Sequence, residues 1–305
     1  MTVERLKHFG KAAKACHVSQ PSLSMQIQKV EEHFGFVIFD RNKKPVLPTD
    51  KGVRFIRQAT KVLAEHEKLV TISQSEGDTV SGSFRLGVIP TLTPYVVPLF
   101  LQSFAENFPL VDLTVDELKT STIVEQLRVD RLDGAILATP LDEKGIRERV
   151  LFYEPFHLYL NQEHPLLKRD QIDHESIQRD EIWLLEDGHC LRNQIVNYCS
   201  FGEESGVFKN VLFEGGNLET LRYMVNSTRG YTLIPELFCR KLSKQERKTN
   251  VRPFASPIPT REVSLVHRRD HWKIDIIASL IKTIKSTIPK DLLTHGESSQ
   301  VLDIY

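Results

Sequence analysis

The stretch GHCLRNQIVNYC, residues 188–199, holds two of the four cysteines of this chain, nine positions apart. If it forms a helix, nine residues correspond to about 900° of turn and roughly 13.5 Å of rise, so Cys190 and Cys199 point from opposite faces. A disulfide needs its Cα atoms within about 7 Å. We therefore expect that the two sulfurs can be joined only if the helix unwinds, so that the reduced and oxidised forms differ in fold.

Cys190 has the surroundings of a reactive thiol. With Asp187 as the N-cap, Cys190 falls in the first helical turn, where the partial positive charge of the helix favours the thiolate, and His189 and Arg192 are near. Cys199 lies among apolar residues and is expected to be buried. Attack of Cys190 on peroxide would give a sulfenic acid that Cys199 could convert to a disulfide. The alternative is that both cysteines are small hydrophobic residues of the core.

The composition of the 305 residues is that of a folded protein, without an apolar run long enough to cross a bilayer and without a signal peptide at the start. We therefore expect a cytoplasmic protein with no membrane partner. The cysteines are too few for a disulfide framework and include no CxxC pair, and the histidines His8, His17, His33 and His66 have no ligand-like spacing. No metal or cofactor is expected. Cys16, on the packing face of a helix, and Cys239 are interpreted as structural.

The formal net charge is zero, but residues 1–58 carry eleven Lys and Arg against five Asp and Glu, which leaves +6 in this segment and −6 in the rest. A basic module joined to a mildly acidic body suggests nucleic-acid contact at one end. The alternative is a chance excess of charge on a solvated face.

The sequence of the basic module predicts a winged helix-turn-helix. Ala12 and Ala13 give a first helix a small-residue face, and a second helix is expected to begin after Ser19 as N-cap. The run FVIFDRNKKPVLPTD predicts two short strands around a basic turn, which would be the wing. The residues expected to contact a major groove or the phosphates are Ser19, Gln20, Pro21, Ser22, Ser24, Gln26, Lys29, Arg41, Lys43 and Lys44.

A helix over residues 53–74 places Ile56, Ala59, Leu63, His66 and Val70 at the spacing of a coiled-coil seam, which predicts dimerisation, with a surface helix packed on its own domain as the alternative. A Gly/Ser-rich hinge follows. From Phe84 the pattern is α/β: a βαβαβ unit, then further alternating strands (HLYL, IWLLE, VLFEG, YTLIP and VSLVHR) and helices, and a loose tail. Two α/β lobes with a ligand cleft between them are expected.

The wording of the first module, AAxxCHVSQPSLSxQIxxxE followed by an aromatic-Asp-Arg and Leu-Pro-Thr, resembles the LysR-type transcriptional regulators. The likeness to peroxide-sensing members of this family continues through GVIPTLTPYVVP, LEDGHCLRNQ and LETLRYMVNSTRGYTLIP. It implies a winged helix-turn-helix plus a periplasmic-binding-protein-like effector domain. Two departures stand out: the helix before FGKAAKAC is short, and Asn193 occupies a place where an acidic residue is expected.

The resemblance also implies roles for particular residues. Cys190 would be the peroxidatic cysteine and Cys199 the resolving one, and Thr91, Thr120, His189 and Arg268 would line the peroxide pocket. From the residues alone, Thr91 could only cap a helix, and Arg268 could be a surface charge. The implied partners are double-stranded DNA, hydrogen peroxide, RNA polymerase and further copies of the chain as a dimer or tetramer.

The expected domains are a DNA-binding domain over 1–52, a linker helix and hinge over 53–82, an effector domain over 83–290 and a loose tail over 291–305. Two other functions fit less of the sequence. One is a LysR-type regulator that senses a small organic ligand with inert cysteines. The other is a thiol peroxidase or Cys/His hydrolase built on Cys190 and His189, although neighbours on a helix project about 100° apart, which places His189 poorly as a base.

Overall fold

The computed structural model of the chain describes residues 1–74, 79–199 and 215–304. The fold divides into two compact units, one formed by Met1–Asp78 with Val129–Arg131 and the other by Thr79–Arg128 with Leu132–Tyr305. No helix among the described residues combines the length and the apolar character needed to cross a membrane.

The first unit is a helix-turn-helix with a small wing. Its elements are α1 (Thr2–Leu6), α2 (Phe9–Ala15), α3 (Gln20–Phe34), β1 (Phe39–Asp40), β2 (Leu47–Pro48) and α4 (Asp50–Gln74). Ser19 caps α3 by accepting a hydrogen bond from the backbone N–H of Ser22, as predicted. Ala12 and Ala13 are buried, but Cys16 is exposed, so its assignment to the packing face is wrong. It follows the last helical residue of α2, where the chain already turns away.

The long helix α4 contributes to the core at its start only. Ile56 is buried with the core of the first unit, whereas Leu63 is half exposed and His66 is exposed. Val62 and Leu69 are also exposed, so the later part of α4 presents apolar side chains to solvent. Of the residues of the predicted seam, Ile56 therefore packs within its own unit, whereas Leu63 and His66 face outward. The side chain of Val70 lies outside the described ones.

The second unit is an α/β structure built on one mixed sheet. Its strands are β3 (Gly82–Val88), β4 (Val111–Glu117), β5 (Gly134–Thr139), β6 (Ile146–Leu160), β7 (Tyr231–Pro235), β8 (Val251–Pro253), β9 (Ile258–Arg268) and β10 (Ser299–Val301). Its α-helices are α5 (Thr93–Asn107), α6 (Thr120–Arg128), α7 (Cys190–Tyr198), α8 (Leu218–Ser227), α9 (Glu236–Cys239), α10 (Lys244–Asn250) and α11 (Ile274–Thr287).

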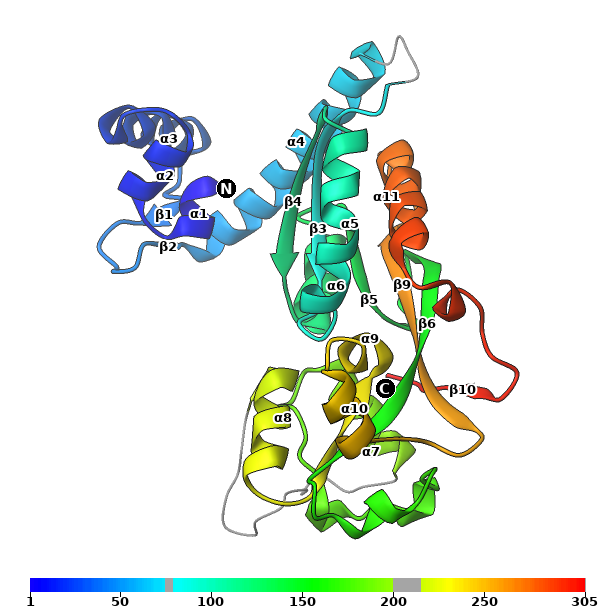
Figure 1. Cartoon of the computed structure of the whole chain (residues 1–305). Coiled ribbons are helices and arrows are strands. Elements are labelled where there is room, and N and C mark those ends of the chain that lie inside the picture. Colours follow the sequence, from blue (N-terminus) through cyan, green and yellow to red (C-terminus); the bar gives the residue numbers. More distant parts are fainter. Residues whose placement is uncertain (75–78, 200–214, 305) are drawn as a thin grey trace. The chain divides into compact units, whose positions relative to one another are not determined.

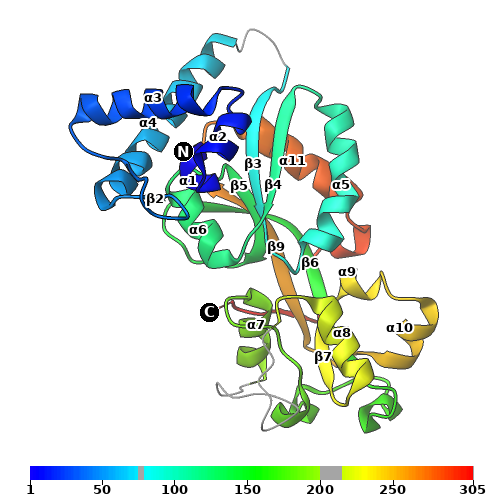
Figure 2. The same cartoon turned by 90° about the vertical axis from the view of Figure 1, so that its left-hand side faces the viewer.

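The strand order β4-β3-β5-β9-β6-β7 explains how two lobes share this sheet. The parallel strands β4, β3 and β5 form the first lobe, as the βαβαβ pattern predicted. The long strands β9 and β6 pair antiparallel and run from the first lobe into the second, where β7 and β8 join β6. Figures 1 and 2 show these two strands as the connection between the lobes. Residues far apart in sequence therefore meet where β6 and β9 cross over.

Some predicted elements differ from those observed. The run IWLLE, residues 182–186, forms no strand and contributes only a bridge between Ile182 and Tyr231. Most of the predicted strand VLFEG lies outside the described residues. The prediction of a loose tail is wrong, because β10 pairs with β9 and because Leu302 and Ile304 are buried. The helices α9 and α10 were not predicted.

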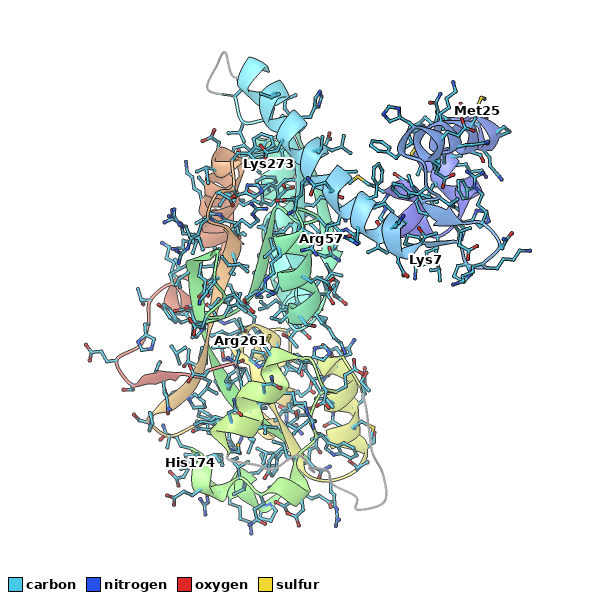
Figure 3. All side chains as sticks on the ribbon, turned by 180° about the vertical axis from the view of Figure 1, so that it is seen from behind. Lys7, Met25, Arg57, His174, Arg261 and Lys273 are labelled. Carbon is cyan, nitrogen blue, oxygen red and sulfur yellow. The ribbon has the colours of Figure 1, made fainter. Side chains whose placement is uncertain are left out.

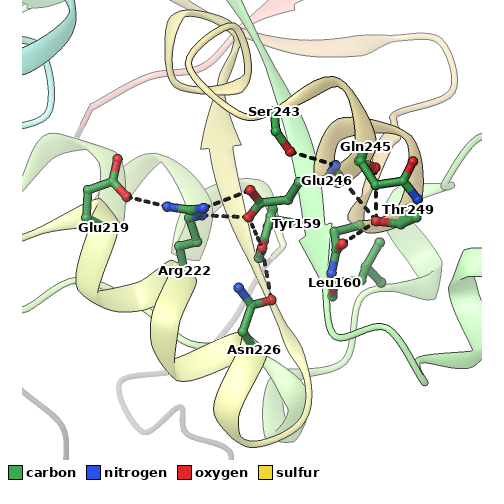
Figure 4. A network of polar contacts seen from close by, with 10 residues as sticks. Tyr159, Leu160, Glu219, Arg222, Asn226, Ser243, Gln245, Glu246 and Thr249 are labelled. Atoms are coloured by element: carbon green, nitrogen blue, oxygen red, sulfur yellow. Dashed lines mark hydrogen bonds and ion pairs between the residues drawn. The ribbon is translucent and has the colours of Figure 1, made fainter.

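A polar network fixes α8 and α10 on β6 in the second lobe (Figure 4). Arg222 of α8 donates two hydrogen bonds to the carboxylate of Glu246 in α10, at 2.6 and 2.7 Å. The hydroxyl of Tyr159 in β6 donates to the same carboxylate at 2.5 Å, and its oxygen lies 2.9 Å from the side-chain amide of Asn226. A bidentate pair constrains direction as well as distance. The network therefore fixes the positions of α8 and α10 relative to β6.

Candidate functional site

Cys190 is the first residue of α7 and is 7% exposed. Its Sγ lies 2.5 Å from the hydroxyl oxygen of Thr120, the first residue of α6 in the other lobe. Burial raises the pKa of the Cys190 thiol above its ordinary value, while the hydrogen bond to Thr120 and the charge of Arg261 act in the opposite direction. Groups that favour the thiolate are therefore present, as expected, but burial acts against them and has the larger effect on the pKa of Cys190.

A buried ion pair lies between the paired strands β6 and β9, near this thiol. Arg261 of β9, labelled in Figure 3, is 1% exposed and donates to Glu154 of β6, which is fully buried, at 2.7 and 2.8 Å. It also donates to the hydroxyl of Thr91 at 3.2 Å and to the Thr91 carbonyl at 3.4 Å. The other carboxylate oxygen of Glu154 accepts from the backbone N–H of Leu237 at 2.6 Å. Thr91 therefore lies at the buried arginine.

The structure does not bring Arg268 to this site. It stands seven residues after Arg261 in the same strand, which corresponds to about 23 Å and, because seven is odd, to the opposite face of the sheet. Arg268 instead pairs with Asp270 at 2.5 Å. Arg261, and not Arg268, is the arginine of β9 that contacts Glu154 and Thr91. A charged residue within the buried strand run IPTREVSLV was the signal that could have identified Arg261.

His189 precedes α7 and is 4% exposed. Its Nε2 lies 3.7 Å from Glu186, which in turn accepts from Lys119 at 2.6 Å. Burial and the charge of Lys119 lower the pKa of His189, which favours the neutral imidazole. Its Nε2 makes no hydrogen bond to any residue that the structure describes. The structure therefore brings the buried thiol of Cys190 to the hydroxyl of Thr120, whereas the buried imidazole of His189 lies toward Glu186.

The second cysteine, Cys199, closes α7 as its C-cap and is partly buried. Burial raises its pKa to about 12. Both thiols are free, and the helix between them has the length predicted from the spacing. Asp187 does not cap it: Gly188, with φ of 88°, turns the chain, His189 takes the N-cap position without a side-chain bond, and Asp187 pairs with Arg192 at 2.6 Å.

The residues predicted to contact DNA lie on α3 and the wing. Gln20, Pro21, Gln26 and Lys29 are exposed, and so are Lys43 and Lys44 of the wing. Met25, on the same helix, also points outward (Figure 3). Ser22 and Ser24 are partly buried. Among the exposed residues, Lys29, Lys43 and Lys44 carry the charge that phosphates would require.

Arg41 is the predicted DNA contact with a clear structural role. Its guanidinium donates to Ser24 at 2.8 Å and to Glu31 at 3.1 Å, and it stacks on the Phe9 ring at 5.2 Å from the centroid. Glu31 also accepts from the backbone N–H of Ile38 at 2.7 Å. Arg41 therefore holds the wing against α3.

One group of possible metal ligands occurs within the described residues. Atoms of His157, Glu236 and Cys239 lie within 4.8 Å of one another. Glu236 already pairs with His157 at 2.7 Å and with Arg240 and Arg247 at 2.8 and 3.1 Å. Two guanidinium groups on the one carboxylate oppose a further cation, and we assign no metal here.

The fold and this site define a class: a helix-turn-helix unit joined to a two-lobed α/β unit. The family model of the bacterial regulatory helix-turn-helix protein, LysR family, matches residues 1–53, and that of the LysR substrate binding domain matches residues 77–288. The chain therefore belongs to the LysR family, whose members are transcriptional regulators rather than enzymes.

Within this family, the chain is similar to regulators named for peroxide. It is 35% identical to the hydrogen peroxide-inducible genes activator of Pectobacterium carotovorum subsp. carotovorum, over 86% of this chain and 85% of that protein. It is equally identical, over the same shares, to the DNA-binding transcriptional dual regulator OxyR of Escherichia coli K12. A solved full-length OxyR variant from Pseudomonas aeruginosa has a TM-score of 0.76 and 31% identity, covering 93% of this chain and 94% of its own.

Proposed function

We propose that this chain is a DNA-binding transcription regulator that responds to hydrogen peroxide through a reversible disulfide between Cys190 and Cys199. One observation supports this above others: a buried thiol at the start of α7 lies against Thr120, and the second thiol ends the same helix. Relatives named as peroxide-inducible activators agree with it. We place the protein in the cytoplasm, where its thiols are reduced.

The proposed chemistry begins at the sulfur of Cys190. The thiolate attacks one oxygen of peroxide, the O–O bond breaks, and the leaving hydroxide takes a proton to become water, so Cys190 becomes a sulfenic acid. The sulfur of Cys199 then attacks that of Cys190, the S–S bond forms, and the sulfenic oxygen leaves as a second water with the proton of the Cys199 thiol. The two thiols lose two electrons, and peroxide gains them.

Thr91, Thr120 and His189 supply the polar groups around this reaction. The unused Nε2 of neutral His189 could accept a hydrogen bond from peroxide, and Thr120 contacts the attacking sulfur. Arg261 takes the part that we expected of Arg268: its positive charge lowers the pKa of Cys190 against the effect of burial. Peroxide would thus be held where negative charge passes from the sulfur of Cys190 to the leaving oxygen.

The first unit would bind double-stranded DNA with α3 in the major groove and the wing lysines on phosphates. We propose domain limits of 1–52 for this function, 53–82 for the linker and 83–304 for the effector part. The exposed apolar residues of α4, including Leu63 and Leu69, would join copies of the chain into a dimer or tetramer. RNA polymerase would be the partner that receives the signal.

The disulfide is tested directly by peptide mapping. Treatment of the reduced full-length protein with one equivalent of hydrogen peroxide should give one intramolecular Cys190–Cys199 crosslink, with Cys16 and Cys239 free. If mass spectrometry finds both thiols of α7 free after treatment, the switch is excluded. The remaining function would then be that of a LysR-type regulator of a small organic ligand.

The raised pKa of Cys190 predicts how the reaction depends on pH. The thiolate is the form that reacts, and while the pH is below the pKa its fraction rises about tenfold with each pH unit. The rate of Cys190 oxidation should therefore rise about tenfold per pH unit between about pH 7 and 9. Quenched-flow mass spectrometry of the Cys199→Ser variant measures this rate. Thr120→Val, which removes a bond that lowers the pKa, should move the profile to higher pH. A rate that levels off below about pH 8 would contradict the prediction.

DNA binding predicts a dependence on salt. Because lysines replace counterions on phosphates, the affinity for an operator duplex should fall steeply between about 50 and 200 mM salt. Lys29→Ala should weaken binding and reduce the slope of log affinity against log salt by about one. Fluorescence anisotropy at several salt concentrations measures both quantities, with Lys282→Ala of the second unit as control. No binding at low salt would show that the short helix α1 is insufficient for the domain.

A further inference from the structure

The segment that follows α11 returns to lie against the helix that carries the two cysteines. Residues 299–304, here called the tail strap, begin with β10, which pairs parallel to the start of β9. The backbone N–H of Leu302 continues the pairing by donating to the carbonyl of Thr260 at 2.9 Å. Leu302 and Ile304 are 5% and 2% exposed, and both belong to the core of the second unit. Figure 2 shows the end of the chain beside α7.

Two side-chain amides of α7 bind the tail strap. The Nε2 of Gln194, which is fully buried, donates to the carbonyl of Leu302 at 3.0 Å. The Nδ2 of Asn193 donates to the carbonyl of Ile304 at 3.2 Å. A carboxylate at either position could not donate these bonds, so the amide of Asn193, where an acidic residue was expected, has a structural use.

Both amides lie inside the loop that a Cys190–Cys199 disulfide would close. The bond requires α7 to lose its helical form, because a helix holds its two ends about 13.5 Å apart. Gln194 and Asn193 project from that helix in fixed directions, and these directions are lost with it. The tail strap would then lose both donors, and a buried carbonyl without a donor is costly.

We propose that the tail strap positions α7 in the thiol form and separates from α7 when the disulfide forms. This proposal rests on the disulfide switch proposed above. The strap favours the thiol form, because its bonds to Gln194 and Asn193 exist only while α7 is helical. Because the tail strap pairs with the start of β9, its separation from α7 would also alter the surroundings of that strand.

The thiol–disulfide equilibrium measures the first part of the proposal. In a glutathione buffer, the protein dithiol and glutathione disulfide give the protein disulfide and two glutathione thiols. Gln194→Met keeps the volume but cannot donate, and it should shift the equilibrium constant about five- to tenfold toward the protein disulfide. A tenfold shift is about 30 mV for this two-electron couple. Gln300→Met, the same change at an exposed position of the strap, is the matched control and should shift nothing.

A second variant perturbs the strap without touching α7. Ile304→Asp places a charge in a buried position and should also favour the disulfide, and it protects the test against a Gln194 variant that does not fold. An equilibrium constant unchanged in both variants overturns the proposal.

Hydrogen exchange separates this proposal from the proposed function. In the wild-type protein, amide hydrogen exchange at residues 299–304 should become faster when the disulfide forms. If these residues stay protected from exchange while α7 loses its protection, the tail strap does not separate from α7 and this part of the proposal is overturned. In the thiol form, Gln194→Met should already make hydrogen exchange at the tail strap faster than in the wild-type protein. Exchange at the wild-type rate would overturn the claim that the tail strap positions α7. If no disulfide forms in any variant, the proposed function fails, and the thiol-form result still decides the positioning.

Discussion

Replacing Cys199 with serine should abolish the stable intramolecular disulfide completely while leaving Cys190 able to react with peroxide. The reason is that Cys199 supplies the second sulfur, whereas the groups around Cys190, namely Thr120 and Arg261, are unchanged. Cys190→Ser should remove both the oxidation and the disulfide. The measurements are mass spectrometry of each cysteine and, in cells, the peroxide response of a reporter under the regulated promoter, which both variants should lose.

Cys16→Ser is the matched control for these two variants. Cys16 is exposed at the end of α2 and has no part in the proposed reaction, so its replacement should leave the disulfide and the response intact. A full peroxide response in Cys199→Ser would show that the signal does not pass through the disulfide.

The second large effect is expected at Glu154. Glu154→Gln should lower the free energy of unfolding of the second unit by about 3–5 kcal/mol, because it leaves the guanidinium of Arg261 buried without its counter-charge. Urea unfolding can be followed through tryptophan fluorescence, since Trp183 and Trp272, the two tryptophans of the chain, both lie in this unit.

An exposed pair in the same unit gives the control. Arg85 and Asp116 form an ion pair at 2.8 Å, but the two side chains are 37% and 34% exposed to solvent. Asp116→Asn should therefore cost at most about 1 kcal/mol. Equal losses from Glu154→Gln and Asp116→Asn would show that burial does not determine the strength of the Arg261 pair.

Most elements could be predicted from the sequence because their signals are local. The alternation of VDLTVDE and the apolar periodicity of the segment that forms α11 each depend on neighbours within one turn or one strand. The Ser19 cap and the extent of α7 belong to the same class. IWLLE shows the limit: its composition is that of a strand, but only Ile182 finds a bridging partner, and strand pairing is decided elsewhere in the chain.

The site divides in the same way. Cys190, Cys199 and the helix between them follow from one short stretch, so this helix was predicted correctly. The choice between Arg261 and Arg268 was not local, because it depends on which end of β9 meets Glu154 of β6 and Thr91 of the first lobe. Burial of Cys190 likewise needs both lobes, and this burial reversed the expected direction of its pKa shift.

The sequence by itself determined the class of the chain, its two-part organisation and the need for a helix to open before its cysteines can join. The class followed from the resemblance of its motifs to a known family, and the other two followed from periodicity and spacing, which act over a few residues. Only the tertiary structure decided which arginine is buried beside the thiol and that the tail strap packs on α7. Such contacts join residues about 70 to 170 positions apart, and their energy depends on burial, which only the folded chain defines.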